Sequence, residues 1–200
     1  MAEDQQFLVA QDQYLKAGIH IGTKFRTKYM ENFIYKIRPD GLAVLNLQKI
    51  DERIKIAARF LSQYSPEGIL VVSRRENGWK AVRAMATAIG NKVFAGRYMP
   101  GLLTNPSLEH YLEVKIILVT DAWPDKNVIN DASKIGVPII ALCDTNNQAN
   151  DIDLVVPCNN KGKKSLGLFF WILTREYLKN RGIIKEDSEF KTPLENFSEE

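Results

Sequence analysis

The sequence predicts an α/β fold, a doubly wound three-layer α/β/α sandwich with a mostly parallel sheet. From residue 42 onward, short apolar runs alternate with amphipathic runs of helical periodicity. The apolar runs are hydrophobic at successive positions, which is typical of strands that helices cover on both faces. Right-handed crossovers between such strands produce an open sheet of the flavodoxin or Rossmann type.

The predicted strands and helices alternate along the chain. We expect strands at 42–47, 68–73, 92–96, 114–120, 137–144 and 153–158. We expect helices at 51–65, 79–90 and 126–136, followed by a closing helix that runs to about Gly182. The first of these helices is expected to open on acidic residues, which favour a helix N-terminus. Residues 97–106 form a long loop with two prolines.

The segment before residue 42 is an extension of this core. Residues 12–22 predict a short helix that ends near Gly18, and the turn sequence Pro39-Asp40-Gly41 predicts a β-hairpin that leads into the first strand. We therefore expect a flexible N-terminus at 1–6 and a single domain at 7–184. Residues 185–200 are expected to form an acidic flexible tail that buries too little surface to become ordered.

Composition excludes several classes of protein. No run of about 18 uncharged apolar residues is present, so no membrane span is expected. The acidic and polar start, MAEDQQFLVA, does not match a secretory signal. Cys143 and Cys158 are the only cysteines and both lie in apolar runs, which predicts buried thiols in a reducing compartment.

The charge is distributed unevenly along the chain. The net charge is +3, but residues 185–200 carry −4 and residues 5–184 carry +9. A basic body with acidic ends favours a polyanionic partner over a neutral one.

The glycine-rich loop CNNKGKKS at 158–165 resembles a phosphate-binding loop at first sight. A P-loop needs a glycine five residues before the Gly-Lys pair, but Pro157 stands there and Lys164 separates the pair from Ser165. No G-x-G-x-x-G opens any helix, so the dinucleotide fingerprint is also missing. We expect no nucleotide cofactor.

Other catalytic patterns are weak. Asp121 and Asp144 end two predicted strands, where aspartates can serve phosphoryl transfer or metal binding, although they are also common turn residues there. The alternative function is therefore a flavodoxin-like small-molecule or nucleotide-binding enzyme that uses these aspartates. His20 and His110 have no ligand at metal spacing, so no metal site is expected.

The basic residues form several clusters with aromatic neighbours. Lys and Arg both suit phosphate oxygens, and exposed rings such as Phe25 and Tyr29 can stack on unpaired bases. Clusters spread over one domain match a long polyanion better than a small substrate. The candidate RNA-binding residues are Lys24, Arg26, Lys28, Arg74, Arg75, Lys80, Arg97, Lys161, Lys163 and Lys164.

Six ordered motifs over residues 7–184 resemble the small-subunit ribosomal protein S-two family. They are Ala17-Gly18-Ile19-His20-Ile21-Gly22, Asp51-Glu52-Arg53, Gly96-Arg97-Tyr98-Met99-Pro100-Gly101, Val119-Thr120-Asp121, Ile140-Ala141-Leu142-Cys143-Asp144-Thr145 and Pro157-Cys158-Asn159-Asn160-Lys161-Gly162. The likeness is to the archaeal and eukaryotic branch, whose eukaryotic form is also called laminin-receptor precursor or protein SA. The short path from Asn105 to the next strand leaves no room for the helical arm of bacterial members.

The resemblance implies a structural, non-enzymatic protein of the cytoplasmic ribosome with no required cofactor. It implies contacts with 16S-type ribosomal RNA and neighbouring ribosomal proteins near the junction of head and body, and a part in subunit assembly. The basic residues it carries over as RNA contacts are Lys24, Arg26, Lys28, Arg97, Lys161, Lys163 and Lys164.

Two stretches depart from the family pattern. The family usually has an arginine after the central strand, whereas this chain reads Asp121-Ala122-Trp123-Pro124-Asp125, so an RNA contact is not expected at that loop. Around Gly78 the family often has Tyr-Gly-Gln, whereas this chain has Asn77 and Trp79 on either side of the glycine. Trp79 can pack either in the core or against a neighbouring protein. The consecutive Phe169, Phe170 and Trp171 cannot share one helix face, so some should be buried while another faces a partner.

Overall fold

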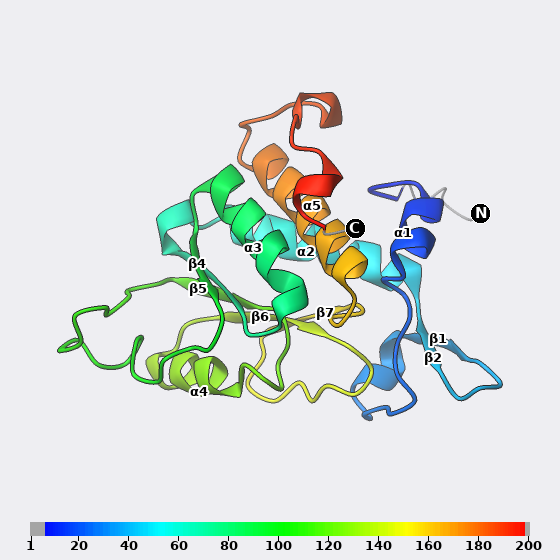
Figure 1. Cartoon of the computed structure of the whole chain (residues 1–200), viewed down its shortest axis with the longest axis horizontal. Helices are drawn as coiled ribbons and strands as arrows, with labels where there is room; N and C mark the ends of the chain where they lie inside the picture. Colours follow the sequence, from blue (N-terminus) through cyan, green and yellow to red (C-terminus); the bar gives the residue numbers. More distant parts are fainter. Residues whose placement is uncertain (1–6, 199–200) are drawn as a thin grey trace.

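Five parallel strands form the central sheet of the protein, whose computed structural model describes residues 7–198 (Figure 1). The strand order is β4-β3-β5-β6-β7. All five strands fall within predicted apolar runs, and every residue of β3, β5, β6 and β7 is buried. The strands are β3 (Ile69–Ser73), β4 (Lys92–Ala95), β5 (Ile116–Val119), β6 (Ile139–Cys143) and β7 (Leu154–Pro157).

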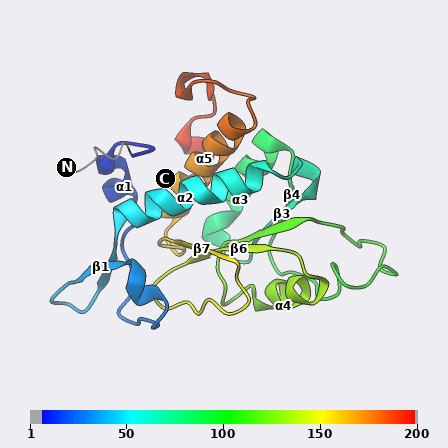
Figure 2. The ribbon, with the colours of Figure 1, turned by 180° about the vertical axis from the view of Figure 1, so that it is seen from behind.

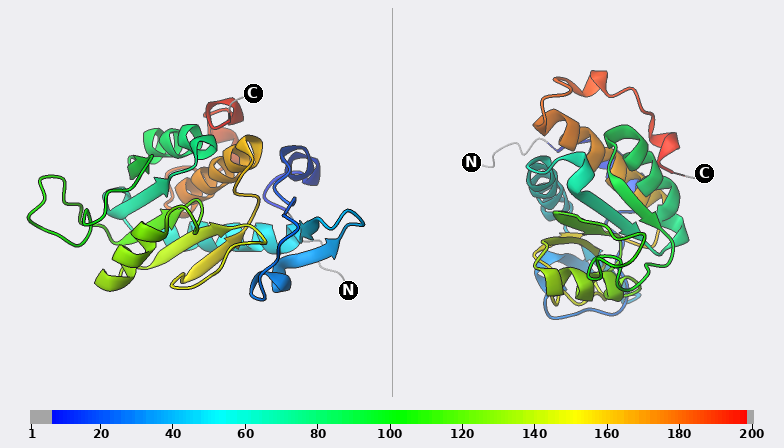
Figure 3. Two further views of the ribbon diagram at one scale, coloured as in Figure 1. Left: turned by 60° about the horizontal axis from the view of Figure 1, so that its bottom comes forward. Right: turned by 90° about the vertical axis from the view of Figure 1, so that its left-hand side faces the viewer.

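Helices cover both faces of this sheet, which confirms the doubly wound prediction. On one face lie α2 (Leu47–Ser62), α3 (Glu76–Ile89) and α5 (Lys163–Asn180), and on the other lies α4 (Lys126–Ile135) (Figures 1 and 2). Figure 3 shows the sheet between these two layers. Helix α5 packs against both α2 and α3, so its position is central in its layer. Its Phe169 and Phe170 are both fully buried, as apolar rings in that position must be.

The N-terminal extension contains α1 (Gln11–Ala17), a 3₁₀ turn at Met30–Phe33 and the predicted hairpin of β1 (Ile34–Ile37) and β2 (Ala43–Leu45). Gly18 ends α1 in the left-handed conformation, at a φ of 69°. The run at 42–47, expected to begin the series of sheet strands, instead forms β2 in a separate antiparallel sheet with β1. Its other edge pairs with the chain near Gly22, whose N–H donates to the Ala43 carbonyl at 2.9 Å.

Two helices begin earlier than the sequence predicts. Helix α2 begins at Leu47 because the Asn46 side chain accepts the Gln48 N–H and caps it. Asp51 therefore lies in the second turn, and the expected acidic first turn is wrong. The Asp51 carboxylate is buried and accepts the Tyr14 hydroxyl at 2.7 Å, which fastens α1 to α2. Helix α3 begins at Glu76, three residues ahead of its predicted start.

The C-terminal segment runs back along α5 through short 3₁₀ turns at Asp187–Glu189 and Leu194–Asn196. Phe197 is 1% exposed, and the Trp171 indole N–H donates to the Thr192 carbonyl at 2.9 Å. Trp171 is thus covered by the chain itself. The flexibility of 185–200 stays a prediction, but its premise that the tail buries too little does not hold for Phe197. The predictions for residues 1–6, and for 199–200 within the tail, lie outside the described residues.

Candidate nucleic-acid interface

Most of the predicted RNA-binding residues lie along the carboxyl edge of the parallel sheet. Because parallel strands end at the same edge, the loops after β3, β4 and β7 place three basic segments along it. Arg74 and Arg75 follow β3, Arg97 follows β4, and the lysines at 161, 163 and 164 follow β7.

The basic loop at 23–29 joins the same edge through threonine hydrogen bonds. The Thr23 N–H donates to the Thr145 Oγ1 at 2.9 Å, and the Thr27 N–H donates to the Thr145 carbonyl at 2.9 Å. The approach is close enough that a Cβ on Gly22 would lie 2.5 Å from the Thr145 Cγ2. Residues 23–29 form a loop and not a strand. Lys24, Arg26 and Lys28 are all exposed, as is 80% of Phe25.

Arg75 is engaged inside the protein. Its Nε and Nη2 atoms both lie 2.5 Å from the Asp121 Oδ2, and Asp121 is only 1% exposed. Strand order reverses between β3 and β5, so this ion pair lies at the switch point where open α/β sheets usually bind their ligands. The crevice that would hold a small ligand in such a fold contains a protein ion pair instead.

The second strand-end aspartate is paired in the same way. The Lys161 Nζ lies 3.0 Å from the Asp144 Oδ2 and 3.2 Å from the Asn146 Oδ1. Asp144 is 1% exposed, and its Oδ1 accepts the Thr145 N–H. Both aspartates are therefore buried carboxylates that pair with partly exposed cations. Within residues 7–198, no three His, Cys, Asp or Glu side chains gather closely enough to hold a metal ion.

Two buried asparagines connect these ion pairs, and sequence reasoning missed them. The Asn147 Nδ2 donates to the Asp121 Oδ1 at 2.8 Å, while its Oδ1 accepts the Asp144 N–H at 2.8 Å and the Asn160 Nδ2 at 3.1 Å. Asn160 also donates to the Leu142 carbonyl. The available signal was an Asn-Asn pair after each of two neighbouring apolar strands, since amides satisfy buried loop groups that apolar residues cannot.

Asn159 shapes the basic loop that leads into α5. Its Oδ1 accepts the N–H groups of Lys161 and Gly162 at 3.1 and 3.3 Å, and its Nδ2 donates to the Gly18 carbonyl at 3.2 Å. The loop is thereby joined to the end of α1. Lys163 and Lys164 lie exposed in the first turn of α5, where the helix dipole also favours an anion.

The loop that carries Arg97 is anchored on α4. Tyr98, 3% exposed, donates its hydroxyl to the Asp131 Oδ2 at 3.1 Å, and the Gly101 N–H donates to the same oxygen at 2.9 Å. Burial, with the Asp131 charge nearby, raises the pKa of Tyr98, so its hydroxyl remains a donor. Arg97 itself stays exposed beside this anchor.

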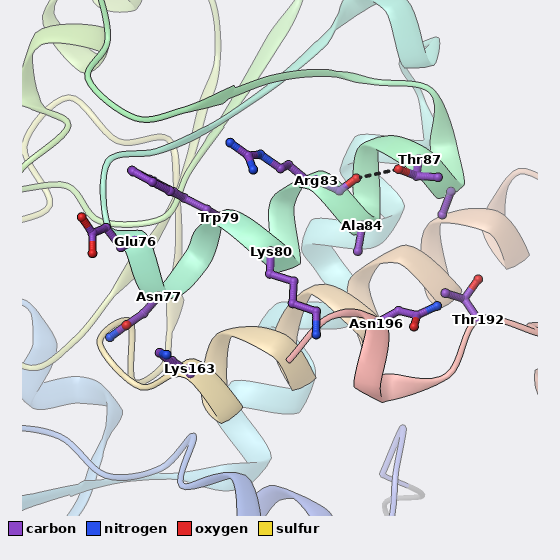
Figure 4. A pocket seen from close by; sticks show the side chains of 11 residues that line it. Glu76, Asn77, Trp79, Lys80, Arg83, Ala84, Thr87, Lys163, Thr192 and Asn196 are labelled. Carbon is purple, nitrogen blue, oxygen red and sulfur yellow. Dashed lines mark hydrogen bonds between the residues drawn. The ribbon is translucent and has the colours of Figure 1, made fainter. Parts of the chain in front are cut away.

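Lys80 lies on the outer side of α3, and its Nζ donates to the Ser198 carbonyl at 2.7 Å. It faces a groove of about 820 Å³ between α3 and the C-terminal segment, which Lys163 also lines (Figure 4). Trp79, in the same groove, is half-buried and donates its indole N–H to the Ser73 carbonyl at 3.1 Å. Its packing is therefore intramolecular, with the Arg83 guanidinium 5.9 Å from the ring centre.

The other exposed cations define what we call the basic edge. It leaves out Arg75 and Lys161, which bind the strand-end aspartates, and Lys80, which donates to the Ser198 carbonyl. Its members are Lys24, Arg26, Lys28, Arg74, Arg97, Lys163 and Lys164. No helix within residues 7–198 is long and apolar enough to cross a membrane.

Comparison with known proteins identifies the family. The family model described as Ribosomal protein S2 matches residues 14–113 and 112–179 of this chain. The chain belongs to the ribosomal protein S2 family. Every residue of the basic edge lies within the ranges that the S2 model matches, and so do both strand-end ion pairs.

Relatives from archaea match this S2-family chain over nearly its whole length. The small ribosomal subunit protein uS2 of Nanoarchaeum equitans is 50% identical over 190 residues, which cover 95% of this chain and 94% of the relative. The uS2 protein of Picrophilus torridus is 45% identical and covers 97% of each chain. That of Saccharolobus solfataricus is 46% identical over 96% of this chain and 83% of its own. The resemblance recognised in the sequence is thus confirmed.

Proposed function

We propose that the chain is a structural, non-catalytic component of the small ribosomal subunit. In this role it binds 16S-type ribosomal RNA and neighbouring ribosomal proteins, near the junction of head and body, in the cytoplasm. Membership of the S2 family and the names of its relatives support the ribosomal assignment. The RNA contacts are assigned to the basic edge on physical grounds.

One observation carries the RNA assignment. The buried carboxylates at the sheet edge are neutralised by Arg75 and Lys161, so they do not cancel the cations that point outward. Seven exposed Lys and Arg side chains then surround the edge. Such an array neutralises several phosphates of an RNA backbone at once, and each contact displaces a condensed counterion.

The alternative enzyme has no support. It needs Asp121 and Asp144 free for a substrate or metal, whereas both carboxylates are buried and ion-paired. General acid–base or phosphoryl chemistry requires a carboxylate within reach of a bound substrate.

The test is the salt dependence of binding to purified small-subunit ribosomal RNA. Lys163→Ala with Lys164→Ala should weaken binding and flatten the slope of log K against log salt by up to about two phosphate equivalents. Adding Lys161→Ala should change the slope by less than one more, because that lysine is held by Asp144.

A matched control uses two exposed lysines at the opposite edge of the sheet. Lys115 precedes β5, and Lys185 follows the end of α5. Lys115→Ala with Lys185→Ala removes the same charge and should leave the slope within error of wild type. Equal slopes for the two double variants would exclude the basic edge as the RNA contact.

A further inference from the structure

A polar pocket lies beside the basic edge, between the loop after β5, helix α4 and the loop after β6. Its volume is about 690 Å³. The lining is rich in amide side chains and includes one large ring. We call it the amide pocket. Its lining includes Trp123, Lys126, Asn130, Asn146, Gln148 and Asn150.

Trp123 is exposed, and hydrogen bonds fix the backbone of its loop. The ring is 73% exposed, an unusual state for the largest side chain. The Trp123 backbone N–H donates to the Asp121 Oδ1 at 3.1 Å, and the Arg74 Nη1 donates to the neighbouring Pro124 carbonyl at 3.2 Å. Trp123 also lines a second hollow together with Arg74 and Arg75. The ring therefore stands between the amide pocket and two arginines.

The chemistry of the pocket suits a base edge better than a phosphate. Asn130, Gln148 and Asn150 make no side-chain hydrogen bond within the part of the chain that the structure describes, so each offers a donor and an acceptor. Lys126 and Asp151 give the lining no net charge. A phosphate would meet the Asp151 carboxylate, whereas that carboxylate can accept from the amino group of a base.

We propose that the amide pocket binds one unpaired nucleobase of the small-subunit RNA, stacked on Trp123. The amides then contact the edge of the base, and Arg74 contacts the adjoining phosphate. Aromatic rings stack on single-stranded bases and amides read their edges, which is the usual mode of RNA recognition outside duplexes. The loop that carries Trp123, where no RNA contact was expected from the sequence, then supplies a stacking contact. This inference rests on the proposed function.

The experiment measures binding of full-length variants to purified small-subunit ribosomal RNA, with chemical probing of its bases. Trp123→Ala should weaken binding about 5- to 150-fold without changing the salt slope, because stacking releases no counterion. Trp123→Phe should keep most of the affinity, since it keeps a stacking ring. Arg74→Ala should reduce the slope by about one.

Base-specific probing identifies the occupant. Wild type and Trp123→Phe should protect an unpaired base that Trp123→Ala leaves reactive. Unchanged affinity and unchanged protection in Trp123→Ala would overturn the proposal, as would a photoreactive side chain at position 123 that cross-links to protein in assembled subunits. If wild type binds the RNA and its affinity falls with salt, either of these results rejects the nucleobase site but leaves the proposed function intact. If wild type shows no salt-dependent binding, the proposed function is rejected as well.

Discussion

Asp121→Ala tests whether the strand-end carboxylate stabilises the fold or serves chemistry. The change removes the partner of Arg75 and the acceptor for the Asn147 amide and the Trp123 N–H. A buried donor without an acceptor and a cation without its counter-charge both destabilise the folded state. We therefore expect a marked loss of stability.

The magnitude follows from the burial of the two partners. Removing one member of a buried ion pair costs about 3–5 kcal/mol. The Arg75 side chain is 33% exposed and can regain water, which lowers the expected cost to about 2–4 kcal/mol. For a chain of this size, that loss lowers the melting temperature by about 5–15 °C.

The assay is thermal unfolding followed by circular dichroism, with Glu109→Ala as the control. Glu109 is an exposed carboxylate on the long loop at 97–113, so its removal should change the melting temperature by no more than about 2 °C. Residues held in place for catalysis often cost stability, so replacing them leaves it unchanged or raises it. An Asp121→Ala melting temperature at or above that of wild type would refute the structural role.

Three further outcomes are expected. Burial raises the pKa of Asp125 from 3.8 to about 7, so the folded state holds a proton that the unfolded chain has released, and stability falls as pH rises through that window. Asp125→Asn should therefore be more stable than wild type at pH 8, by at most about 4 kcal/mol, and should melt at a higher temperature there. Near pH 4 the two proteins should melt at the same temperature. Phe197→Ala should loosen the C-terminal segment that covers Trp171, because it removes the buried ring of that segment. The expected signs are a red-shifted tryptophan emission and faster proteolysis beyond residue 185 than in wild type. If wild type is cleaved there as fast as the variant, the tail is flexible. Cys143 and Cys158 are fully buried, and burial raises the pKa of both thiols, so a thiol reagent should label them only after unfolding. If the reagent labels either cysteine rapidly in the native protein, the two thiols are not buried.

The ion pairs show why local patterns predicted cations but not their partners. Arg75 and Asp121 are 46 residues apart, and no spacing rule connects them. Because β3 lies beside β5 in the folded sheet, the Arg75 Nη2 comes within 2.5 Å of the Asp121 Oδ2. The Arg75 side chain is therefore only 33% exposed. Arg74, the next residue along the chain, stays exposed because successive residues after a strand point in different directions.

The sequence by itself determined the parallel sheet, the order of its helices and the family, because buried strands need continuous apolar runs and the family motifs are contiguous. Tertiary structure alone decided that residues 43–45 leave the sheet, that Phe197 returns to α5, and that Trp123 faces an amide-lined pocket. These features depend on contacts between distant segments, whose free energy arises only after the chain has folded and which no local window of residues contains.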